Sequence, residues 1–97
     1  QNMKVYISGP MTGIPDYNKT AFKAAEAALI AKGHSVVNPW DLGEVPYWGH
    51  HEYMKRDIAA MAECFGIYML PGWLRSRGAK AEWFVALFVF GMRRVRL

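Results

Sequence analysis

The chain is poor in cysteine, with only Cys64 among its 97 residues. A lone cysteine cannot form a disulfide within the chain, and no cysteine or histidine spacing typical of a zinc site is present. Because disulfides mark oxidising compartments, the sequence favours a reducing, cytoplasmic setting. We expect neither a disulfide framework nor a metal site.

Long hydrophobic runs and targeting signals are also lacking. The most apolar stretch, residues 83–92, is far shorter than the roughly 20 residues that cross a bilayer, and nothing resembles a signal peptide. We therefore expect no membrane partner. Gln1 and Asn2 precede Met3 and look like residues of an expression tag, so the expected domain is a single one over residues 3–97.

Several ligand-binding signatures are missing. The Gly-x-Gly-x-x-Gly pattern of dinucleotide sites and the Gly-Lys-Ser/Thr loop of triphosphate sites do not occur, and no cofactor is expected. The net charge is +4, but Arg93, Arg94 and Arg96 supply three of these charges at one end of the chain. Basic residues are not interleaved with aromatic ones elsewhere, so we expect no nucleic-acid polymer as a partner. An anionic small molecule is compatible with this charge.

Apolar residues, in contrast, are abundant: 53% of the residues are hydrophobic and 14% are aromatic. This composition excludes a mainly disordered chain. A domain of this length has room for one modest core, so another subunit should cover part of the apolar surface. We expect a homodimer or a larger homo-oligomer.

Strand-like and helix-like segments alternate along the chain. Short β-branched or aromatic runs predict strands, and apolar residues at spacings of three and four predict helices. The expected strands are residues 4–8, 35–37, 65–70 and 92–97, and the expected helices are residues 19–32, 50–64 and a third that begins at 76–79 and continues to 90. Asn18 is placed to cap the first helix. This order predicts an α/β fold of three layers, α/β/α, with a Rossmann-like, flavodoxin-like parallel sheet of about four to five strands.

The carboxyl ends of parallel strands are where ligands bind in such a fold. Residues 8–13, 38–40 and 71–79 follow the first three expected strands and should meet there. Residues 40–49 are irregular and rich in aromatic side chains, which predicts a pocket wall or an interface.

Residues 68–86 are the most informative stretch, because a strand, a loop of small residues and a helix start follow one another there. Backbone N–H groups at such a helix start favour an anion. Ser76, Gly78 and Ala79 would form the cradle, and Glu82 lies about one helical turn beyond it. The geometry suggests nucleophilic or acid–base chemistry on a small molecule. The alternative is that Glu82 only complements the dipole of its own helix.

Four motifs in this order resemble the nucleoside 2-deoxyribosyltransferase superfamily, over nearly the whole chain. They are Tyr-Ile-Ser-Gly-Pro-Met at 6–11, Asn-Pro at 38–39, Tyr-Met-x-x-Asp at 53–57 and Leu-Pro-Gly-Trp-x-x-Ser-x-Gly-Ala-x-x-Glu at 70–82. Within the superfamily the chain is most similar to short phage and bacterial proteins known only as a domain of unknown function. Deoxynucleoside 5′-monophosphate N-glycosidases are related to them.

The resemblance implies cleavage or transfer at the N-glycosidic bond of a (deoxy)nucleoside or nucleoside 5′-monophosphate, with Glu82 as the nucleophile. Asp57 matches a second acid that orients the nucleophile or transfers a proton, and Tyr6 matches an aromatic residue whose hydroxyl lies near the sugar and the nucleophile. From the residues alone, Asp57 could instead be an exposed acid paired with Lys55 or Arg56, and Tyr6 a buried strand residue.

The resemblance also implies a set of substrate-binding residues. Ser76 and Gly78 match residues that hold the phosphate in the monophosphate hydrolases, whereas Pro10 is like the transferases that act on free nucleosides. Trp73 could stack on a nucleobase or pack in the core. The full expected set is Ser8, Gly9, Pro10, Met11, Asn38, Trp73, Ser76, Gly78 and Ala79.

Two other classes of function stay open. One is a non-catalytic protein that binds or sequesters a nucleotide. The other is an interaction protein whose interface uses exposed aromatic side chains, among them Trp40, Tyr47, Trp48 and Trp73.

Overall fold

A four-stranded, all-parallel sheet forms the centre of the computed structural model, which describes residues 2–97; the expectation for Gln1 lies outside the described residues. The strands are β1 (Lys4–Ser8), β2 (Ser35–Val37), β3 (Gly66–Met69) and β4 (Arg93–Val95), in the order β2-β1-β3-β4. In the register, Tyr6 of β1 lies between Val37 of β2 and Ile67 of β3. The first strand of the sequence is therefore internal to the sheet.

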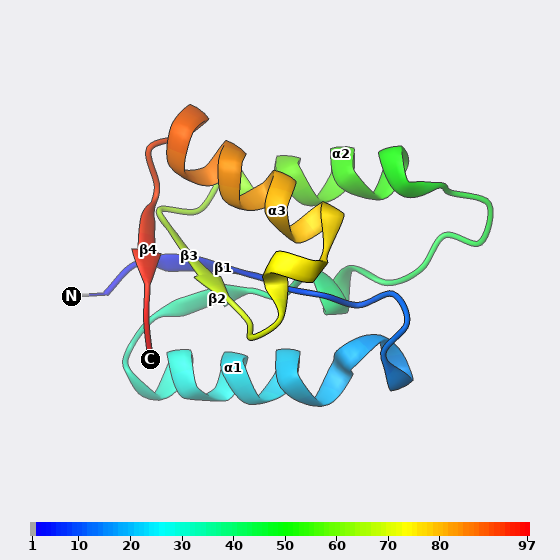
Figure 1. The fold of residues 1–97 in the computed structure, drawn as a ribbon. Helices are drawn as coiled ribbons and strands as arrows, with labels where there is room; N and C mark the ends of the chain where they lie inside the picture. The colour runs from blue at the N-terminus through cyan, green and yellow to red at the C-terminus, as the bar shows by residue number, and fades with distance from the viewer. Residues whose placement is uncertain (1) are drawn as a thin grey trace.

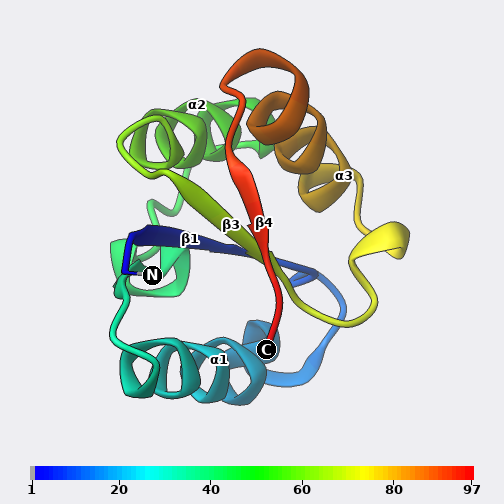
Figure 2. The same cartoon turned by 90° about the vertical axis from the view of Figure 1, so that its left-hand side faces the viewer.

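Helices cover both faces of the sheet. Helix α1 (Lys19–Ala31) lies on one face, and α2 (His50–Met61) and α3 (Arg77–Phe84) lie on the other (Figures 1 and 2). The chain adds β2 on one side of β1, and it then adds β3 and β4 on the other side. Because each crossover is right-handed, helices that connect strands in opposite directions lie on opposite faces of the sheet. The predicted three-layer α/β fold with a parallel sheet is confirmed.

Alternation along β1 divides its side chains between two cores. Val5 and Ile7 pack with Phe22 and Leu29 of α1. Tyr6 points the other way, into a cluster that includes Met61, Ile67, Met69 and Ala79. Ser8 follows Tyr6 at a spacing of two residues and thus faces α2 and α3 as well. The two-residue repeat of side-chain directions along β1 therefore places the hydroxyl groups of Tyr6 and Ser8 on the face that α2 and α3 cover.

The ends of the helices differ in part from the predicted ones. Helix α2 ends at Met61, because the N–H of Cys64 bonds the carbonyl of Met61 and tightens the last turn. Regular α3 ends at Phe84, and a π-helical turn (Val85–Val89) replaces the predicted α-helix. In that turn the N–H of Phe90 bonds the carbonyl of Val85, five residues earlier.

Asn18 occupies the N-cap position of α1 as predicted, but its side chain makes no capping hydrogen bond. This residue precedes α1 in a left-handed conformation with φ 66°, and its side-chain amide donates to the carbonyl of Pro10 at 2.9 Å. The side chain therefore ties the loop after β1 to the start of α1.

No helix within residues 2–97 has both the length and the apolar character needed to cross a membrane.

Candidate functional site

The candidate site lies where β1 and β3 end. Because β1 leads to α1 on one face and β3 leads towards α3 on the other, the loops after these strands separate, which is the usual place for a ligand crevice. Close packing at this point depends on Gly9, since a Cβ atom there would lie 2.6 Å from Cβ of Leu70. The backbone after β1 can thus approach the end of β3.

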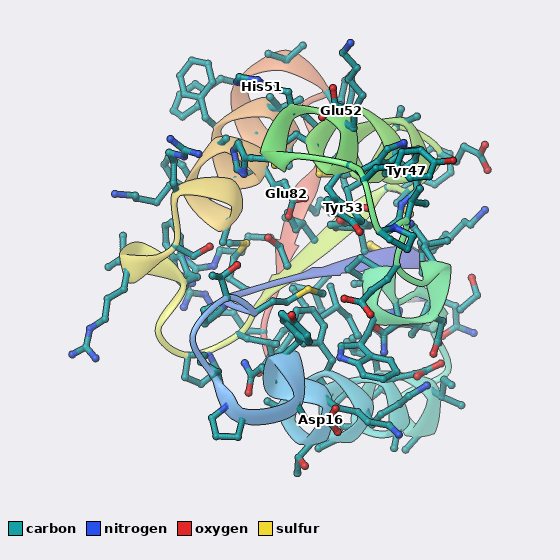
Figure 3. The ribbon with its side chains drawn as sticks, turned by 90° about the vertical axis from the view of Figure 1, so that its right-hand side faces the viewer. Asp16, Tyr47, His51, Glu52, Tyr53 and Glu82 are labelled. Carbon is teal, nitrogen blue, oxygen red and sulfur yellow. The ribbon has the colours of Figure 1, made fainter. Side chains whose placement is uncertain are left out.

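Glu82 is the central residue of the site. It lies on α3 and its side chain points inward between the helices and the sheet, whereas Glu52 lies on the outer side of α2 (Figure 3). The hydroxyl of Ser8 donates to Oε1 of Glu82 at 2.6 Å, and the hydroxyl of Tyr6 donates to Oε2 at 3.1 Å. Glu82 is only 6% exposed. Both carboxylate oxygens are therefore held by β1, more than 70 residues away in the sequence.

Burial changes the acidity of this carboxyl group. It raises the pKa of Glu82 to about 7, and the nearby charge of Asp57 acts in the same direction, while the hydrogen bonds from Ser8 and Tyr6 oppose the rise. Near neutral pH the protonated and ionised forms of Glu82 are thus both populated. Burial and the charge of Glu82 also raise the pKa of the Tyr6 hydroxyl well above its usual value, so it stays a hydrogen-bond donor.

Asp57 is the second acid of the site. Its side chain is 16% exposed, and Nε of Arg56 donates to its Oδ1 at 3.3 Å. Burial raises the pKa of Asp57, and the charge and hydrogen bond of Arg56 oppose the rise. The pairing with Arg56 corresponds to one of the two alternatives from sequence, but Asp57 is largely buried and also acts electrostatically on Glu82 and Tyr6.

The predicted anion cradle forms the start of α3. Ser76 caps this helix, because its hydroxyl oxygen accepts a hydrogen bond from the N–H of Ala79 at 3.1 Å. Gly78 faces α2, and a Cβ atom there would lie 3.4 Å from Sδ of Met54. The helix start lies where it was predicted; contact of these residues with a phosphate stays a prediction.

Other predicted binding residues are engaged within the fold. Asn38 is buried, accepts from the N–H of Trp40 at 3.0 Å and donates to Glu26 Oε1 at 3.2 Å. Pro10 offers its carbonyl to Asn18, and Met11 packs against the core beside α1. These contacts give each residue a structural role, whether or not it also meets a ligand.

Trp73 is not a free aromatic platform. Its ring stacks on Trp83 with centroids 5.5 Å apart, and the guanidinium of Arg94 lies 5.6 Å from its centroid. It borders an open hollow of about 500 Å³, together with Tyr68, Met69, Leu70, Pro71, Gly72, Leu74, Arg75 and Arg94. A larger hollow of about 750 Å³ lies at the amino ends of the strands, bounded by residues such as Lys4 and Ser35, and includes none of the predicted site residues.

Sequence reasoning missed two roles. It assigned Ser8 to the substrate and did not connect it with Glu82, and it treated Arg56 only as a possible neighbour of Asp57. Arg56 also donates to the carbonyls of Leu42 and Gly43, where the loop before α2 begins. The signal that could have revealed this is an arginine next to the acid on a helix that follows an aromatic loop.

The described residues contain no group of three or more His, Cys, Asp or Glu side chains arranged to hold a metal ion. What the site offers is a buried carboxylate with two hydroxyl donors and a second acid nearby. This set can supply a nucleophile and an acid–base group, or hydrogen bonds to a polar ligand.

Comparisons with known proteins identify a family. Residues 3–92 match the family described as a domain of unknown function, DUF4406. No curated protein and no solved structure matches the chain.

Proposed function

The chain belongs to the DUF4406 family, and we propose that it cleaves or transfers at the N-glycosidic bond of a (deoxy)nucleoside or nucleoside 5′-monophosphate. One observation carries the proposal: the buried carboxylate of Glu82 is held through both oxygens by Ser8 and Tyr6 at the carboxyl ends of the strands. The resemblance to nucleoside 2-deoxyribosyltransferases supports the choice of substrate.

In the proposed first step, an ionised oxygen of Glu82 attacks C1′ of the sugar. The new Oε–C1′ bond forms as the C1′–N bond breaks, and the electron pair of that bond leaves with the base. Asp57 in its protonated form gives a proton to the departing nitrogen. Water or the nitrogen of a second base then attacks C1′, returns a proton to Asp57 and releases Glu82.

Burial favours this chemistry. A negative charge costs free energy in the interior, and ester formation removes that charge from Glu82. The hydroxyls of Ser8 and Tyr6 fix the orientation of the carboxylate, so that little rearrangement is needed for attack. The raised pKa of Asp57 helps it to carry the proton that the base requires.

A panel of nucleosides and 5′-monophosphates, with chromatography of the released base, tests the proposal.

Glu82→Gln should lower turnover by several powers of ten and leave ligand binding largely intact, since an amide is a poor nucleophile of similar size. Glu63→Gln is the matched control, because Glu63 is an exposed acid whose ion pair is with Lys4, at the start of β1. Failure of the wild-type protein to release base from any of these compounds would overturn the proposal.

A second candidate is a non-catalytic nucleotide-binding protein. Two features of Glu82 favour it: both carboxylate oxygens already accept hydrogen bonds, and the residue is only 6% exposed. Both features make attack on a substrate harder. In this function Glu82 would hydrogen-bond a sugar hydroxyl. Tight binding of a nucleotide by calorimetry, without release of base, would select it.

The setting of the proposed activity is a cytoplasmic homodimer or larger homo-oligomer. Burial of Cys64 raises the pKa of its thiol to about 11, so this thiol is a poor nucleophile towards oxidants or other thiols. Exposed apolar side chains on α3 and the turn after it support the association.

A further inference from the structure

Arg56 on α2 makes contacts in two directions. Its Nε donates to Asp57, and its Nη1 donates to the carbonyls of Leu42 at 3.2 Å and Gly43 at 2.8 Å. The same guanidinium lies 5.5 Å from the ring centroid of Trp48 and 5.2 Å from that of Tyr53. One side chain therefore contacts both an acid of the candidate site and the loop before α2.

The loop of residues 43–49 is held mainly from α2. The hydroxyl of Tyr53 accepts from the N–H of Val45 at 2.8 Å and donates to its carbonyl at 2.9 Å. The N–H of Gly49 donates to Glu52 at 2.9 Å. Tyr47 is 87% exposed, so the middle of the loop buries little apolar surface. Figure 1 shows the loop on the side towards which β1 runs, and Figure 3 shows Tyr47 beside Tyr53.

We propose that Arg56 is a positioning residue that holds the 43–49 loop against α2 and, with the same guanidinium, fixes the carboxylate of Asp57. The contacts of Arg56 stand by themselves; the catalytic meaning of Asp57 rests on the proposed function. The position of the loop and the position of the Asp57 carboxylate are then coupled, because both depend on the same guanidinium group.

Movement of the loop changes the charge state of the site. The titratable groups that act on or respond to Asp57 are Arg56 on its own helix, Tyr6 on β1 and Glu82 on α3. Arg56 lowers the pKa of Asp57 against the effect of burial. When the loop moves away, Arg56 loses the carbonyl of Gly43 and the ring of Trp48, and it is then held less firmly beside Asp57. The pKa of Asp57 then rises, and protonated Asp57 no longer raises the pKa of Glu82. A closed loop thus favours ionised Asp57, and an open loop favours its protonated form.

The test uses the ligand-free protein and needs no activity. The Asp57 carboxyl carbon, assigned with Asp57→Asn, is titrated by NMR, and hydrogen exchange is measured at the N–H groups of Val45 and Trp48. Arg56→Gln should raise the titration midpoint of Asp57 and speed exchange in the loop at least tenfold. Lys55→Gln removes the same charge from the neighbouring exposed position and should change neither.

Two further variants separate the charge from the coupling. Arg56→Lys keeps the charge near Asp57 but cannot reach both carbonyls in the same way, so exchange should speed up with a smaller change in the Asp57 midpoint. Tyr53→Phe loosens the loop without altering the arginine, and should raise the Asp57 midpoint in the same direction as Arg56→Gln. An Asp57 midpoint that Tyr53→Phe leaves unchanged while the loop opens would overturn the coupling. Unchanged loop exchange in Arg56→Gln would overturn the positioning role.

If the protein does cleave nucleosides, Arg56→Gln should also shift the pH profile of kcat. If it does not, the proposed function fails, while the titration and exchange results still decide the role of Arg56.

Discussion

At the scale of the residue, Glu82 is a carboxyl group whose ionised form the fold destabilises. The folded protein raises its pKa from 4.5 to about 7, mainly by burial. The folded state therefore binds a proton more tightly than the unfolded chain between these two pH values. The contribution of Glu82 protonation to the free energy of unfolding is fully present below about pH 4.5 and is lost as the pH rises to about 7.

Replacement of Glu82 by Gln should therefore stabilise the protein at pH 8. The gain comes from removing the buried charge and reaches at most about 3 kcal/mol, the equivalent of a shift of about 2.5 pH units. At pH 4 the difference between the two proteins should be much smaller. Urea unfolding at both pH values measures this, and equal effects at pH 4 and pH 8 would contradict a raised pKa.

The two hydroxyl donors should control the pH at which Glu82 becomes ionised. Ser8→Ala and Tyr6→Phe each remove a hydrogen bond that lowers its pKa, so each should move the titration midpoint upward, with the larger change in Ser8→Ala. Carboxyl NMR, or the pH dependence of base release, gives the midpoint. A midpoint that stays near 7 in Ser8→Ala would show that this bond does not favour the ionised form.

The helix start after the third expected strand pointed to Glu82, and the resemblance to the superfamily added Asp57 and Tyr6, with the Tyr6 hydroxyl near the nucleophile. The sequence did not predict Ser8 as a partner of Glu82, since that contact joins residues 74 positions apart and depends on how α3 packs over β1. For Asn38, the sequence predicted the position but not the contacts. Its place after β2 was predicted, but its hydrogen bonds to the backbone and to Glu26 come from tertiary packing.

At the scale of the element, strand limits were the easiest feature to predict. The limits of β1 and β2 agree with the expected residues, because Gly9-Pro10 and Pro39 end these strands. The π-helical turn after α3 could not be predicted, since residues 85–89 have the apolar pattern of an ordinary helix. Its cause is tertiary: Met92 must reach the core, and its N–H bonds the carbonyl of Ala86.

Two glycines should respond differently to substitution. Gly9→Ala places a Cβ atom 2.6 Å from Leu70 and should force apart the ends of β1 and β3, with a loss of about 1 to 3 kcal/mol. Gly78→Ala meets only ordinary contacts on a helix and should be neutral or stabilise by up to about 1 kcal/mol. Urea unfolding compares them, and equal losses would contradict the close approach at Gly9.

At the scale of the whole molecule, one group of exposed apolar side chains lies on α3 and the π-helical turn that follows it. Phe84, Phe88 and Val89 are 55%, 67% and 62% exposed and all belong to α3 or the turn that follows it. The rings of Phe84 and Phe88 contact each other, with centroids 5.2 Å apart. Exposed apolar side chains that lie together in this way are typical of a contact with another chain.

We expect the protein to sediment as a dimer or larger species at micromolar concentration. Phe88→Glu should shift this equilibrium towards the monomer, because it places a charge in the centre of the apolar surface. Ile30→Glu is the control, since Ile30 is an exposed apolar residue (54%) on α1, which covers the other face of the sheet. A wild-type protein that is monomeric under these conditions would contradict the expectation.

The internal position of β1 has a consequence for the synthesis of the protein. Tyr6 is synthesised before its partner Glu82, which follows 76 residues later. At bacterial or eukaryotic translation speeds this delay is roughly 4 to 15 seconds. During that time β1 can find β2 and then β3, but its two hydroxyl groups have no carboxylate to hold. The site is therefore completed only after β1, β2 and β3 have been made, and a nascent chain that stalls before α3 carries three strands of the sheet without Glu82.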